Sequence, residues 1–212
     1  MAHPEYIRKK AIQLRVEKKL TIDEIAERLS VSRTTAFYWV GRIKIPETAK
    51  QSEKRRKASL ANSERARLKR ERSYQQGVDE FDDLAKDETF RDFVCMYLGE
   101  GSKRCRNTVC IANSDPTVIA LGSRWIRRLG KNKIRYSVQY HADQDLHELQ
   151  EFWSGIVGVL PEDINLQRKS NSNQLTGRTW RSAHGVLSVS MGDTQLRARL
   201  EAWMDRIRSE WK

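Results

Sequence analysis

The sequence has no apolar run that approaches the roughly 18 residues a membrane-spanning helix needs. Its first ten residues are already charged and polar, so we expect no secretion signal there. There are only three cysteines, which in a cytosolic protein argues against a disulfide framework. These absences predict a cytoplasmic protein without structural disulfides.

Several chemical motifs are also lacking. No nucleophile–base pair is recognisable, and no glycine-rich loop of the kind that cradles phosphates is present. Cys105 and Cys110, with scattered histidines such as His141 and His184, match no compact zinc motif, so we expect buried thiols. The two histidines are interpreted as residues of a sheet face. We predict no cofactor, and the sequence favours a protein that is not an enzyme.

Positive charge is what the sequence has in excess. Lys and Arg number 40 against 28 Asp and Glu, a formal charge of +12, and the mean hydropathy is -0.74. A strongly basic chain points first to a polyanionic partner, most simply nucleic acid. The excess of positive charge also argues against a function as a non-enzymatic protein-interaction module.

The charge is divided into blocks along the chain. Residues 1–49 carry a net +4, residues 50–72 a net +7, residues 73–100 a net -6 and residues 101–212 a net +7. This pattern predicts a small basic domain at 1–47, a charged helical connector at 48–87 and a larger domain at 88–212.

Residues 5–46 have apolar side chains at helical spacing, which predicts three short helices. Thr21 and Glu24 form a capping box at the start of the second helix. Ser32 is a good N-cap for the third helix, and Pro46 is expected to end it.

The stretch from Thr21 to Val40 resembles the helix-turn-helix of resolvases and invertases. The catalytic recombinase domain is absent, so the resemblance implies DNA binding without strand exchange. A three-helix module for protein contacts is the alternative. On the DNA-binding interpretation, residues of the third helix and its N-cap contact bases and phosphates in a major groove. The predicted contacts are Ser32, Arg33, Thr34, Thr35, Phe37, Tyr38, Arg42 and Lys44.

The connector at 48–87 is rich in helix formers and poor in apolar residues. This composition favours a solvated helix or a disordered linker. Its cations would contact phosphates without reading sequence. The acidic run at 79–83 either docks on the basic connector or forms a helix surface.

The larger domain alternates strand and helix patterns. Apolar residues with period two predict strands near 109–112, 134–141, 164–169 and 186–191, with helical stripes between and after them. We predict an α+β fold with helices on one face of a sheet. The other face is expected to be polar and basic, suited to a duplex, unless it is a plain solvent-facing surface. The predicted DNA contacts of this domain are Lys103, Arg104, Arg106, Arg135, Ser137, Gln139, His141, Arg168 and Lys169.

Residues 93–98 are all apolar, so a helix there is expected to be buried on every side. Cys95 and Gly99 are small and four residues apart, which allows another helix to approach closely. Glu100 would lie at the buried end of this helix, where the dipole disfavours a carboxylate. It would need a metal, solvent or a basic partner such as Lys103 or Arg104.

Residues 97–103, residues 113–116, the pair Phe152–Trp153 and the helix with Trp203 resemble the LAGLIDADG-like domain of bacterial helix-turn-helix proteins. The resemblance covers residues 90–208 and places Glu100 on the metal-binding acid of the family. Homing endonucleases of this fold use two such acids, one from each motif, and this chain has one motif. Actinobacterial sporulation regulators resemble the arrangement too, with a non-cleaving domain beside a helix-turn-helix.

Two functions follow from these patterns. The first is a sequence-specific, nucleoid-associated DNA-binding protein, most simply a transcriptional regulator. The alternative is a Mg-dependent homing-type endonuclease in which two subunits each supply Glu100. Asp115 would assist only if the fold brings it near. Either protein could form a homodimer through the helix with Cys95 and Gly99.

Overall fold

A computed structural model describes residues 3–45, 49–170 and 182–212 of the chain. Contacts divide the chain into two compact units, Met1–Asn62 and Ser63–Lys212. The boundary between the units falls inside one long helix, α4 (Ala49–Leu84). Each unit is described by itself.

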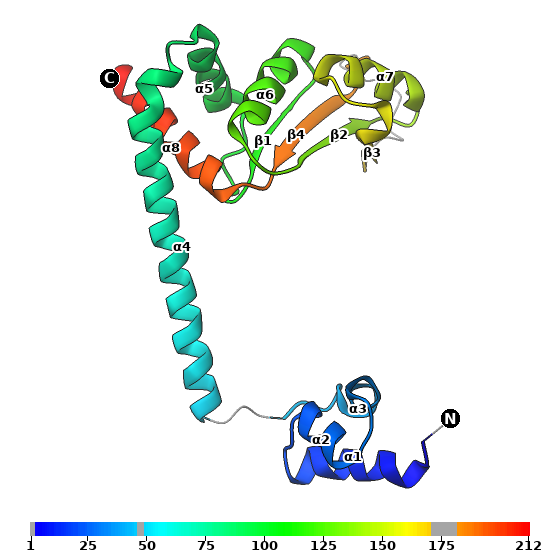
Figure 1. Ribbon diagram of the computed structural model, residues 1–212. Coiled ribbons are helices and arrows are strands. Elements are labelled where there is room, and N and C mark those ends of the chain that lie inside the picture. The colour runs from blue at the N-terminus through cyan, green and yellow to red at the C-terminus, as the bar shows by residue number, and fades with distance from the viewer. Residues whose placement is uncertain (1–2, 46–48, 171–181) are drawn as a thin grey trace. The chain divides into compact units, whose positions relative to one another are not determined.

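The first unit contains three short helices, α1 (Glu5–Glu17), α2 (Ile22–Arg28) and α3 (Arg33–Val40) (Figure 1). They enclose a small apolar core in which alanines allow the helices to approach closely. The fully or nearly buried members of this core are Ala11, Ile25, Ala26, Ala36 and Val40.

The predicted helix starts in this unit are confirmed. The Thr21 hydroxyl accepts a hydrogen bond from the Glu24 amide, and the Thr21 amide donates to the Glu24 carboxylate at 2.7 Å, which completes the capping box. Ser32 accepts from the Thr35 amide at 3.0 Å.

The predicted end of the third helix is wrong, because α3 stops at Val40 with Gly41 as its C-cap. Pro46 lies outside the described residues. The early stop has a physical reason in Arg15, which donates to the carbonyls of Leu20 and Ile43 and holds the chain after α3 close to α1. Ile43 packs against the core of the unit as a result.

Helix α4 buries almost nothing along its basic part and then packs firmly. Its side chains are mostly exposed between residues 52 and 72, as expected for a solvated helix. From Ser73 onward the helix packs on α8 (Thr194–Glu210), where Gly77 and Phe81 are buried. The acidic run does not dock on the basic connector, because Glu80 instead forms an ion pair with Arg199 of α8.

The second unit continues from the end of α4 with alternating helices and strands. These are α5 (Glu88–Glu100), β1 (Val109–Asn113), α6 (Pro116–Leu129), β2 (Ile134–Tyr140), α7 (Leu146–Val157), the 3-10 turn η1 (Pro161–Asp163), β3 (Ile164–Arg168), β4 (Val186–Met191) and α8. The predicted α+β class is confirmed.

The four strands form one mixed sheet in the order β1-β4-β2-β3. Strand β4 pairs antiparallel with both β1 and β2, and β3 pairs parallel with β2. Helices α5, α6 and α7 lie on one side of the sheet (Figure 1). Within the described part of this unit, no helix covers the opposite side.

The core between sheet and helices is dominated by aromatic rings. Trp125, Trp153 and Trp203 are almost completely buried. Phe90 lies edge-on to both Trp125 and Trp203, at centroid distances of 5.2 and 5.1 Å, an arrangement that aromatic quadrupoles favour. The Trp203 indole donates to the Gly77 carbonyl at 2.9 Å, so one core residue joins α8 to α4.

Candidate nucleic-acid interface

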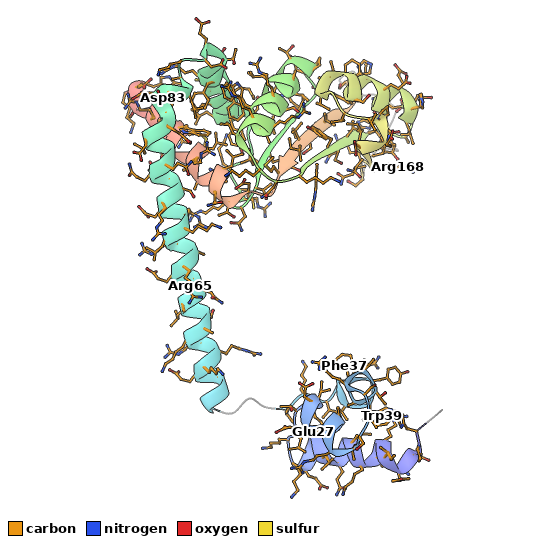
Figure 2. All side chains as sticks on the ribbon, viewed as in Figure 1. Glu27, Phe37, Trp39, Arg65, Asp83 and Arg168 are labelled. Atoms are coloured by element: carbon orange, nitrogen blue, oxygen red, sulfur yellow. The ribbon has the colours of Figure 1, made fainter. Side chains whose placement is uncertain are left out.

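Helix α3 presents an outward face that its own unit does not use. Phe37 and Tyr38 are 57% and 85% exposed, although both are large aromatic residues. Trp39, the next residue, is half-buried against the core. Figure 2 shows Phe37 and Trp39 on this helix. Exposed aromatic side chains on so short a helix are candidates for contact with a partner.

The first turn of α3 is partly engaged by its own structure. Ser32 and Thr35 share a hydrogen bond between their hydroxyls at 2.8 Å while Ser32 caps the helix. Arg33 forms an exposed ion pair with Asp23 at 2.6 Å. Thr34, Arg42 and Lys44 are exposed. The structure thus brings the predicted residues of this unit together, and a partner would have to compete with Asp23 for Arg33.

The uncovered face of the sheet is built from short polar side chains in register. One row across the strands contains Cys110, Ser190 and Arg135, and the next contains Ala112, Ser188, Ser137 and Asn165. A third row contains Val186, Gln139 and Gln167. Most of these residues line one shallow hollow.

This face is less basic than expected. Among the residues of its three rows, Arg135 is the one cation, so the face is polar rather than positively charged. Arg168 does not belong to it, because it pairs with Tyr140 and shares the side of the sheet that Ile164 and Leu166 occupy. Figure 2 shows Arg168 at the end of β3. His141 directly follows the last residue of β2, and Lys169 directly follows the last residue of β3. The alternation of side chains along the two strands assigns both residues to the uncovered side of the sheet.

The helix α5 differs from its prediction. Phe90, Phe93, Val94 and Tyr97 are buried, but Cys95 and Gly99 are exposed. A Cβ atom added at Gly99 would have no neighbour within 4 Å. The prediction that this helix is buried on every side is therefore wrong for a single chain, because only one face of α5 packs against the rest of the unit.

Glu100 is exposed at the end of α5 rather than buried. Its carboxylate accepts a hydrogen bond from the Asn113 side chain at 3.1 Å. Lys103 is not its partner, because the Lys103 ammonium donates to the carbonyls of Leu98 and Gly99. A cation on the last carbonyls of a helix stabilises its C-terminus.

Asn113 also connects Glu100 with Asp115. The Asn113 side-chain oxygen accepts from the Asp115 amide at 2.9 Å. The Asp115 carboxylate itself caps α6 by accepting from the Thr117 amide at 2.7 Å. The sequence placed Asn113 in the segment 113–116 that carries the resemblance, but no local pattern predicted its hydrogen bond to Glu100.

Cys105 and Cys110 are not the fully buried thiols that were expected. Cys95 and Cys105 are exposed and Cys110 is half-buried. Hydrogen bonds that the Cys105 thiol makes with the Asn107 backbone and the Thr108 hydroxyl lower its pKa. The sheet-face interpretation of His184 is also wrong, because its ring stacks on Phe152 of α7 at 3.7 Å.

The donors of one chain do not by themselves fit a magnesium site. Mg²⁺ is usually held by one or two carboxylates together with waters and substrate phosphates. The described residues contain no group of three or more His, Cys, Asp or Glu side chains arranged to hold a metal. Glu100 supplies one carboxylate per chain.

No protein-family model, curated protein or solved structure matches this chain. Among the described helices, none combines the length and apolar character needed to cross a membrane. The function is therefore inferred from the charge and geometry of the chain itself.

Proposed function

We propose that the protein is a cytoplasmic, nucleoid-associated regulator of transcription that binds double-stranded DNA in a sequence-specific manner. In this proposal α2 and α3 are a helix-turn-helix, and the second unit is a LAGLIDADG-like domain that adds contacts through its uncovered sheet face. The observation that carries the proposal is the outward face of α3, with Phe37 and Tyr38 in solvent.

The chemistry of that face suits a major groove. A helix-turn-helix places the N-terminal residues of its second helix against base edges. Thr34 can reach bases or phosphates, and the aromatic rings can contact thymine methyl groups. The exposed cations Arg42 and Lys44 follow the helix, where they can meet the phosphate backbone.

The experiment is a selection from a random duplex pool, followed by retardation of the selected site and of a scrambled duplex. Tyr38→Ala should weaken binding to the selected site by roughly five- to 150-fold, since a lost specific contact costs about 1–3 kcal/mol. Tyr6→Ala is the matched control, because Tyr6 is 71% exposed on α1 and lies outside the proposed interface. No retardation of any duplex at low salt would refute the proposal.

The alternative is a Mg-dependent endonuclease that acts as a homodimer. The exposed carboxylate of Glu100, oriented by Asn113, is the feature that supports it. Two chains would have to bring their Glu100 residues together, because one chain supplies only one acid. A discrete cut with Mg²⁺ that Glu100→Gln abolishes and Asp92→Asn preserves would favour the nuclease. Intact DNA under binding conditions would favour the regulator.

We also propose a homodimer through the exposed face of α5. The face contains Cys95 and Gly99, whose small size leaves room for a second helix. Such close approach needs small residues on both helices. Two identical chains provide this symmetry directly.

A further inference from the structure

We infer that the second unit carries a separate surface for DNA phosphates, built at one end of the sheet and on the adjoining part of α4. The inference rests on the proposed function and adds sequence-independent contacts to it. It differs from the sheet face, whose three rows hold one cation.

The sheet register places two basic loops at the same end. Val109 of β1 and Ile134 of β2 both pair with Met191, the last residue of β4. The segment before β1 therefore lies beside the segment before β2. The first segment contains Arg104 and Arg106, and the second contains Lys131 and Lys133, all exposed.

Hydrogen bonds hold these loops to the start of α8. The Thr194 hydroxyl donates to the Asn107 side chain at 3.3 Å. The Asn132 side chain donates to the Gly192 carbonyl at 2.7 Å. Both loops are therefore tied to the turn between β4 and α8.

Helix α4 reaches the same turn with its basic part. Arg65, Lys69 and Arg72 line a hollow together with Gln195, in the first turn of α8, and no acid lines this hollow. Figure 2 shows Arg65 on α4. The basic part of α4 and the two loops thus flank one short segment, residues 192–195.

The cations of this surface are not engaged by hydrogen bonds or ion pairs within the part of the chain that the structure describes. Seven basic residues contribute to it, and none forms a side-chain hydrogen bond or ion pair with another described residue. Lys103 is not counted, because it caps α5. Glu162 and Asp163 line a hollow with Lys131 and Lys133 and reduce the net charge locally. The seven are Arg65, Lys69, Arg72, Arg104, Arg106, Lys131 and Lys133.

Unpaired cations on two loops and a helix fit the phosphates of a duplex. Phosphate contacts release counterions, so the logarithm of the binding constant falls by about 0.9 per contact for each tenfold rise in salt. Such contacts position the protein and carry no sequence information. The surface would therefore strengthen binding to every duplex.

The test measures salt dependence with two pairs of substitutions, Arg65→Gln with Lys69→Gln and Arg104→Gln with Arg106→Gln. Each pair should lower the salt slope by up to about 2 and weaken binding at 0.1 M salt by roughly ten- to sixtyfold. The loss should be equal for the selected site and a random duplex. The matched control is Lys86→Gln with Lys212→Gln, two exposed cations outside this surface.

The outcomes separate this inference from the proposed function. If the wild-type chain binds its selected site and both pairs behave like the control pair, the phosphate surface is refuted and the proposed function stands. A loss confined to the selected site would mean base readout and would also overturn it. If the wild-type chain retards no duplex, the proposed function fails first.

Discussion

Replacing Gly77 with alanine should destabilise the second unit, although alanine favours helices. Gly77 lies inside α4, where alanine gains about 1 kcal/mol over glycine. A Cβ atom at this position would lie 2.8 Å from both the Cα and the carbonyl oxygen of Arg199. These are backbone atoms of α8, so the two helices must separate.

Overpacking of this kind costs about 1–3 kcal/mol. Separation of the helices would also lengthen the hydrogen bond from Trp203 to the Gly77 carbonyl, which contributes about 1 kcal/mol. Set against the gain in helix propensity, the net loss is about 1–3 kcal/mol. For a unit of this size it corresponds to a fall of roughly 2–12 °C in Tm.

Gly155→Ala is the matched control. Gly155 also lies inside a helix, α7, but a Cβ atom there would have no neighbour within 4 Å. This variant should therefore raise Tm by a few degrees, through helix propensity alone. Thermal unfolding followed by circular dichroism measures both variants. A rise in Tm for Gly77→Ala equal to that of Gly155→Ala would refute the packing of α4 on α8.

Three further predictions concern other parts of the chain. Ser32→Ala should lower the free energy of unfolding of the first unit by about 1 kcal/mol, because it removes the N-cap of α3, whereas Thr34→Ala should change it little. Urea unfolding followed by Trp39 fluorescence compares the two variants. Burial raises the pKa of Tyr97, so the wild-type chain should lose stability as pH rises above about 10, and Tyr97→Phe should flatten this loss in alkaline melting curves. Cys95→Arg should convert a dimer into a monomer in sedimentation experiments, whereas Glu148→Arg on α7 should not; a wild-type monomer at tens of micromolar would contradict the α5 dimer.

Local signals in the sequence predicted much of the fold. The capping box at Thr21 and the cap at Ser32 depend on residues a few positions apart, and both are present in the structure. The strands at 109–113 and 186–191 follow their period-two pattern, because one face of the sheet is buried and the other is not. Such signals need no knowledge of distant contacts.

The remaining features depend on tertiary contacts that no local pattern reports. The apolar run in α5 did not reveal which face would stay exposed, since that depends on where the sheet and α8 lie. Glu80 was part of an acidic run with no visible partner, and Arg199 lies more than a hundred residues away. The strand order β1-β4-β2-β3 determines which loops share an end of the sheet, and hence where basic loops meet.

The position of Lys103 affects how substitution experiments that search for DNA contacts have to be interpreted. It stands in a basic loop, so a loss of binding in a Lys103 variant would ordinarily be attributed to a missing phosphate contact. Its ammonium instead rests on the carbonyls of Leu98 and Gly99. The same variant would release the end of α5 and the loop that carries Arg104 and Arg106. In an alanine scan of the proposed interface, a loss of binding at Lys103 would therefore report the loosened end of α5 together with any lost phosphate contact.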